Sequence, residues 1–185
     1  MAWTGFIAGT GRLAGPDRRE MAKSDCVVIW GTNAVHTQVN VMHHAIKARK
    51  ERGAKIVAID IYHNPTLAQA DLALVLRPGT DGALACAVMH VLFRDGHADR
   101  DYLARYTDAP AELEEHLDSR TPEWADAITG VEIDAIELAV EMRRERRMLL
   151  GLDDRALKDL GLARGDAYAE ATRASAEAIA AAVRR

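Results

Sequence analysis

The sequence predicts an α/β fold: a parallel β-sheet followed by an all-helical C-terminal region. Three short apolar segments predict the sheet, residues 26–30, 55–59 and 72–76, and each is closed by turn-forming or acidic residues. Runs of this kind are typical of strands buried on both faces. The segment between the first two has helical spacing, and a crossover of that length joins parallel strands in a right-handed βαβ unit.

The helix after the first strand is expected to end at Gly53, because basic residues precede this glycine and glycine is a common helix stop. Four residues recur at helical spacing and are expected to share one face of this helix: Val39, Met42, His43 and Ile46. The second strand ends at Asp60, and a short turn or helix is expected to begin at residue 64 before the third strand.

Beyond residue 81 the pattern is helical throughout. Thr121 is expected to cap one of these helices, with Pro122 at its first position. The sequence predicts helices over residues 84–92, 99–106, 112–117, 122–128, from 133 onward, 153–160 and 166–183.

Composition bounds the function. The chain has 185 residues, 49% of them hydrophobic, and a formal net charge of -4, values typical of a soluble globular protein rather than a disordered, fibrous or membrane-spanning one. Two cysteines, Cys26 and Cys86, cannot build a disulfide scaffold or a four-cysteine iron–sulfur site. The apolar start lacks the basic segment of a signal peptide, so a cytoplasmic location is expected.

The charge distribution suggests two domains, residues 1–140 and 141–185. The second of these carries 10 basic and 8 acidic side chains, whereas the whole chain has fewer basic than acidic residues, 24 against 28. It opens with an arginine cluster, Arg143, Arg144, Arg146 and Arg147. Such an asymmetry predicts a small arginine-rich helical tail attached to the α/β domain.

Candidate binding residues follow the three strands, because ligands of parallel sheets bind outside the carboxyl ends of the strands. Gly31 would let the backbone approach a phosphate, Asp60 could accept hydrogen bonds from ribose hydroxyls, and Asp81 could accept the ring N–H and the exocyclic amine of guanine. The candidates are Gly31, Thr32, Asn33, His36, Asp60, Tyr62, His63, Gly79, Thr80 and Asp81.

Each candidate also has a structural interpretation. Residues 31–33 lack the full glycine motif of dinucleotide-binding loops and could form only a turn, and both Asp60 and Asp81 could be helix N-caps. Adjacent His43 and His44 point about 100° apart on a helix and do not easily share a metal ion. No catalytic triad or carboxylate pair stands out, and no metal site is expected.

The ordered motifs resemble a central domain of molybdopterin oxidoreductases of the dimethyl sulfoxide reductase family, which includes formate dehydrogenases and nitrate reductases. The resemblance covers about residues 15–140. The segments that carry it are residues 24–33, 54–60, 69–71, 76–84, 101–103, 121–125 and 128–131.

The resemblance implies a Rossmann-like unit that holds the guanosine diphosphate end of molybdopterin guanine dinucleotide. Residues 30–37 would meet the pyrophosphate, residues 60–64 the ribose and its surroundings, and residues 79–81 the guanine. Family enzymes also carry an iron–sulfur segment, a molybdenum ligand and a β-rich domain, none of which is recognisable here. The resemblance therefore implies a truncated, formate dehydrogenase-like oxidoreductase module, not catalytic alone, which the remaining parts of a molybdoenzyme could complete.

The tail resembles the arginine-rich bacterial domain-of-unknown-function family 1127, over about residues 143–166 and beyond. Some members of that family are linked to RNA-related regulation, so RNA or partner binding through the arginine cluster is an alternative function. A solvated helix face, with Glu141 and Glu145 pairing the arginines, is the structural interpretation. A chimeric reading frame without a function of its own is a third interpretation.

Overall fold

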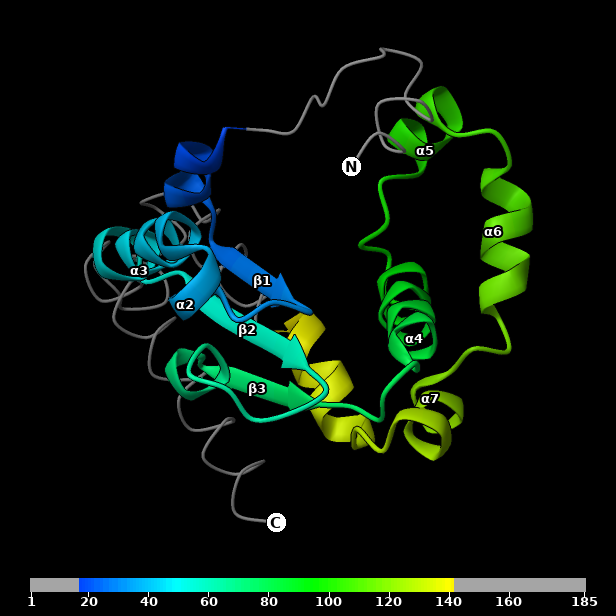
Figure 1. The fold of residues 1–185 in the computed structure, drawn as a ribbon. Coiled ribbons are helices and arrows are strands. Elements are labelled where there is room, and N and C mark those ends of the chain that lie inside the picture. The colour runs from blue at the N-terminus through cyan, green and yellow to red at the C-terminus, as the bar shows by residue number, and fades with distance from the viewer. Residues whose placement is uncertain (1–16, 142–185) are drawn as a thin grey trace, which may run out of the picture.

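The protein is described by a computed structural model in which residues 17–141 are placed. Three parallel strands form the sheet in the order β1-β2-β3, where β1 is Cys26–Trp30, β2 is Lys55–Asp60 and β3 is Leu72–Val75. The three arrowheads point toward the same edge of the sheet (Figure 1). The expected strands and the parallel α/β fold are confirmed.

The middle strand is apolar between its polar end residues, Lys55 and Asp60, because both of its faces are covered. Every residue of β2 is buried, as expected for a strand with neighbours on both sides and helices above and below. Side chains alternate between the two faces: Ile56 packs toward one cluster with Val27, and Val57 toward another with Leu74. This alternation sorts the apolar side chains into two cores separated by the sheet.

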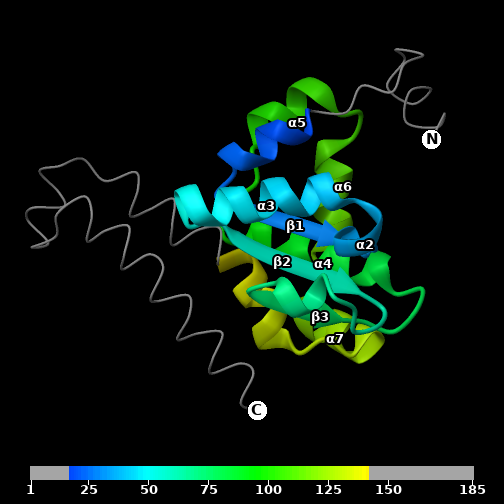
Figure 2. The same cartoon turned by 60° about the vertical axis from the view of Figure 1, so that its left-hand side comes forward.

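One face of the sheet is covered by α3 (Val39–Arg52), which lies opposite α4 (Asp81–Arg94) and α7 (Pro122–Thr129) (Figure 2). The four residues expected to share one face of this helix differ in burial: Met42 is buried, Ile46 is half-buried, and Val39 and His43 are exposed. The residues against the sheet are Met42, Ala45 and Ala48. Small alanines allow the helix to approach the strands closely, and this packing determines which side of the helix faces the sheet. The helix ends at Gly53 in the left-handed conformation, as expected.

The other face is covered by helices that follow β3. A 3-10 helix, η2 (Leu67–Gln69), precedes β3, and α4 (Asp81–Arg94) follows it. Next come α5 (Arg100–Tyr106), α6 (Pro110–Leu117) and α7 (Pro122–Thr129), and residues 133–141 are helical again. The Thr121 hydroxyl accepts the Trp124 N–H, so the expected N-cap is confirmed. The expected tail helices lie outside the described residues.

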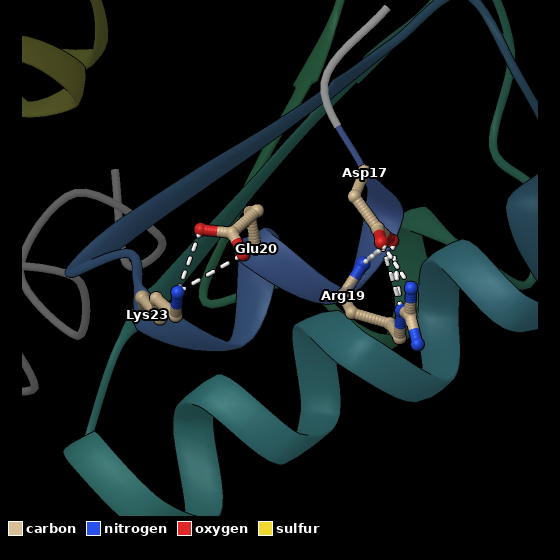
Figure 3. A network of polar contacts seen from close by, with 4 residues as sticks. All are labelled: Asp17, Arg19, Glu20 and Lys23. Atoms are coloured by element: carbon tan, nitrogen blue, oxygen red, sulfur yellow. Dashed lines mark hydrogen bonds and ion pairs between the residues drawn. The ribbon is translucent and has the colours of Figure 1, made fainter.

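Two elements had no counterpart in the sequence analysis. The four-residue helix α2 (Ala34–Thr37) lies between β1 and α3, and the 3-10 helix η1 (Arg18–Lys23) precedes β1 and packs on α3. Asp17 caps η1: its carboxylate accepts the Arg19 N–H, and the Arg19 Nε–Oδ2 distance is 2.8 Å (Figure 3). Both elements are shorter than the stretch of sequence over which a helical periodicity can be recognised.

We expect the Asp17 carboxyl to titrate at an unusually acidic pH. The Arg19 side chain donates to this carboxylate, which lowers the pKa of Asp17 to about 2. Because the pKa of Asp17 is lower in the folded state, its ionised carboxylate stabilises the fold fully at pH values above the ordinary pKa of aspartate. This stabilisation is lost as the pH falls toward 2. NMR titration of the Asp17 carboxyl should show this midpoint, and Arg19→Met should return it toward the ordinary value. An ordinary midpoint in the unmodified protein would contradict the contact.

None of the helices formed by residues 17–141 has both the length and the apolar character that a membrane span requires.

Candidate functional site

The first loop of the candidate site begins where β1 ends. Gly31 has a φ of 64°, in the left-handed region that favours glycine, and its N–H extends the sheet ladder to the Ile59 carbonyl at 2.8 Å. This turn carries the chain over the edge of the sheet and into α2. Gly31 is exposed, and Thr32 and Asn33 beside it are half-buried.

The second loop is held by a chain of buried polar groups. Asp60 ends β2 and is 8% exposed; its two carboxylate oxygens accept the Ile61 N–H and the Asn64 side-chain amide. The side-chain oxygen of Asn64, Oδ1, in turn accepts hydrogen bonds from the backbone N–H groups of Thr66 and Leu67. These bonds satisfy the polar groups that the loop buries, and they fix its path.

The first two loops are linked to each other through Thr66. Its hydroxyl lies 3.1 Å from the Asn33 side-chain oxygen, to which it can donate, and it accepts the Val35 N–H, also at 3.1 Å. Thr66 is fully buried, so these bonds are protected from water. The predicted site residue Asn33 is therefore connected to Asp60 through Thr66 and Asn64.

The third loop is linked to the first by an indole. Gly79 has a φ of 81°, and the Thr80 hydroxyl donates to the Arg77 carbonyl, which tightens the turn before α4. Asp81 is the first residue of α4, and its Oδ1 accepts the Trp30 Nε1–H at 2.7 Å. Trp30 ends β1, so the carboxyl edge of the sheet ties the first and third loops together.

Some of the predicted site residues are linked to one another by hydrogen bonds, and others are exposed. Asn33 and Asp60 belong to the hydrogen-bonded network, and Asp81 is connected to the same edge through Trp30. His36 on α2 and Tyr62 and His63 on the second loop are exposed, and their side chains make no hydrogen bond to another of residues 17–141. Neither aspartate is a helix N-cap: Asp60 ends a strand, and Thr80 precedes Asp81 at the cap position of α4.

A cavity of about 500 Å³ lies beside β1, on the face of the sheet that carries α4. It extends along β1 and past the side chains of α4, and it is lined by Cys26, Val28, Trp30, Val88, Leu92 and Val140, among others. Trp30 lines this cavity and also donates to Asp81 of the third loop, so it contributes to both. Cys26 lies at the start of β1, against the core, and Cys86 lies within α4.

Histidines and carboxylates do not gather into a metal site within residues 17–141, where no three His, Cys, Asp or Glu side chains are suitably grouped. The His43 and His44 rings meet edge to face, 5.2 Å apart. His90 bonds the Leu117 carbonyl at 2.8 Å, which joins α4 to α6. The arginine cluster at residues 143–147 lies outside the described residues, so RNA or partner binding through it stays a prediction.

Sequence reasoning did not predict the linking roles of three residues that organise the site: Trp30, Asn64 and Thr66. Trp30 was expected at the end of an apolar strand and in the segment 30–37 that would meet the pyrophosphate. Its hydrogen bond was not foreseen, although an indole N–H at a strand end needs an acceptor when it is half-buried. The Asn64-Pro65-Thr66 segment carried a signal as well, because Asn commonly bonds backbone groups two residues on. The partners of these side chains are more than 30 residues away in two cases, so only the fold identifies them.

A parallel sheet covered by helices on both faces, with three linked loops at its carboxyl edge, defines a domain of the parallel α/β class. Within this class the chain belongs to the molybdopterin oxidoreductase family, whose model matches residues 10–176. The resemblance drawn from the motifs is confirmed. The match crosses the predicted domain boundary at residue 140, and that boundary stays a prediction.

Several proteins are similar to this chain. The probable oxidoreductase YoaE of Bacillus subtilis is 40% identical over 141 residues, which are 76% of this chain and 21% of that protein. The F420-dependent formate dehydrogenase 1 subunit alpha of Methanococcus maripaludis is 38% identical over 66% of this chain and 18% of its own length. Acetylene hydratase from Pelobacter acetylenicus superposes with a TM-score of 0.58 at 27% identity, over 64% of this chain and 16% of that chain. The chain thus spans about a fifth of the length of the curated relatives it matches.

Proposed function

We propose that the three loops bind the guanosine diphosphate end of molybdopterin guanine dinucleotide, as one part of the cofactor site of a formate dehydrogenase-like oxidoreductase. The observation that carries this proposal is the linkage of Asn33, Asp60 and Asp81 at one edge of the sheet. The proposal gives the chain a binding role and assigns it no catalytic residue. The molybdopterin supplies the redox chemistry of the family when bound.

The chemistry of the loops fits the ligand. At Gly31 no atom lies within 4 Å of the place a Cβ would occupy, and its exposed backbone leaves room for a pyrophosphate, for which Thr32 and Asn33 offer polar side chains. Asp81 is half-buried, and its Oδ2 accepts no hydrogen bond from another residue in the described range 17–141. A carboxylate in this condition can accept from the N–H groups of a guanine.

Asp60 has a different role in this proposal from the one that its position in the sequence suggested. Both of its oxygens already accept hydrogen bonds from the protein. Each oxygen retains a second lone pair, but the burial of the carboxylate limits access to it. We therefore propose that Asp60 mainly shapes the second loop, and that the exposed residues Tyr62 and His63 lie closer to the bound ribose.

We expect the full chain to bind guanosine diphosphate, and Asp81→Ala to weaken this binding by about tenfold to a hundredfold, the usual worth of a bidentate contact to a base. Isothermal titration calorimetry with guanosine diphosphate measures the affinity directly. The matched control is Asp101→Ala, because Asp101 also lies in the first turn of a helix, α5, and is exposed away from the loops.

Equal and negligible binding by the wild type and Asp81→Ala would refute the proposal. An equal loss in Asp81→Ala and Asp101→Ala would indicate a general charge effect rather than recognition of the base. The redox substrate is outside this proposal, because the similar proteins carry names as different as formate dehydrogenase and acetylene hydratase.

A further inference from the structure

Trp30 makes a hydrogen bond that joins two loops of the candidate site across 51 residues of sequence. Its Nε1–H points at Asp81 Oδ1 from the end of β1, at 2.7 Å, while its ring packs against the core on the α4 face of the sheet. The indole N–H can only donate, so it requires an acceptor at this position. The packed ring thus presents a fixed donor to a carboxylate in the first turn of α4.

A fixed carboxylate and a rotating one recognise a base differently. Guanine presents two neighbouring donors, its ring N–H and its exocyclic amine, and both oxygens of one carboxylate must lie in the plane of the base to accept them. Adenine presents a lone pair at the equivalent ring nitrogen, which a carboxylate repels. Selectivity for guanine therefore depends on how well the carboxylate is held, as well as on its charge.

We propose that Trp30 is a positioning residue that sets the guanine selectivity of the site. It holds the Asp81 carboxylate through one lone pair of Oδ1, so that Oδ2 and the second lone pair of Oδ1 stay available to the two donors of the base. This inference rests on the proposed function and adds to it the residue that discriminates between purines. Trp30 need not touch the nucleotide itself, because it acts through Asp81.

Binding of guanosine diphosphate and adenosine diphosphate to the full chain tests this role. Trp30→Phe keeps an aromatic ring in the core but removes the N–H. We expect it to reduce the affinity for guanosine diphosphate by about tenfold, the typical worth of a hydrogen bond to a charged group. The affinity for adenosine diphosphate should stay within about twofold, since its pyrophosphate contacts are unchanged.

The matched control is Trp124→Phe. Trp124 packs against the same core cluster as Trp30, but its ring lies against the Arg120 guanidinium, 5.0 Å from the ring centroid. Trp124→Phe makes the same change in ring size as Trp30→Phe. This variant should keep the wild-type ratio of the two affinities. In an Asp81→Ala background, Trp30→Phe should cause no further change in that ratio, because the group it positions is gone.

A second measurement needs no nucleotide. In protein labelled with ¹⁵N at tryptophan, the Trp30 indole N–H resonance should shift in Asp81→Ala, whereas the Trp124 resonance should not. A wild-type ratio of affinities in Trp30→Phe, or an unchanged Trp30 resonance in Asp81→Ala, overturns the inference while leaving the proposed function standing. Failure of the wild type to bind guanosine diphosphate instead overturns the proposed function, and the inference with it.

Discussion

Leu84→Ala is expected to lower the free energy of unfolding by about 2 to 5 kcal/mol, the range for deleting a buried leucine side chain. Leu84 is fully buried in the first turns of α4, where it packs into the core cluster formed by β2, β3, α7 and the helix at residues 133–141. Its removal leaves a cavity between the sheet and the helix that carries Asp81. Urea unfolding, followed by circular dichroism, should show a lower midpoint.

The same position provides the control. Leu84→Met keeps nearly the same volume, so it should cost less than about 1.5 kcal/mol. If Leu84→Ala and Leu84→Met were equally stable, α4 would not be packed on the sheet as the structure has it. The destabilised Leu84→Ala should also bind nucleotide more weakly, because α4 sets the position of the third loop.

Asn64→Leu is expected to have an effect of similar size for a different reason. The Asn64 side chain makes three hydrogen bonds in a buried position, to Asp60, Thr66 and Leu67. Leucine has nearly the same shape but can satisfy none of these groups, and each buried polar group left without a partner costs about 1 to 3 kcal/mol. We expect a total loss of about 3 to 5 kcal/mol in the free energy of unfolding, measured by urea unfolding.

This variant should also weaken nucleotide binding, because the second loop would lose its connection to Asn33 through Thr66. Asn40→Leu is the matched control: Asn40 is exposed on α3, and the same change of side chain there should alter stability by less than about 0.5 kcal/mol. Equal stabilities of Asn64→Leu and Asn40→Leu would show that the buried network contributes little.

The sheet was predictable because its information is local. Each strand is an apolar run closed by Gly31, Asp60 or a Pro-Gly turn, and the length of the crossover between strands dictates parallel pairing. The helix ends were predictable for the same reason, since Gly53 and Thr121 act on their own backbone neighbours. The buried face of α3 was not, because Val39 and His43 share a periodicity with Met42 that does not say which side meets the sheet.

The sequence by itself determined the class of fold, the family and the three loops in which the candidate residues lie. Only the tertiary structure decided how these loops are held: the Trp30–Asp81 bond and the link from Thr66 to Asn33 each join residues from different loops. Periodicity and turn chemistry describe a residue relative to its near neighbours in the chain. A hydrogen bond between distant segments depends on the packing of the sheet and helices that bring them together, and that packing is a property of the whole fold.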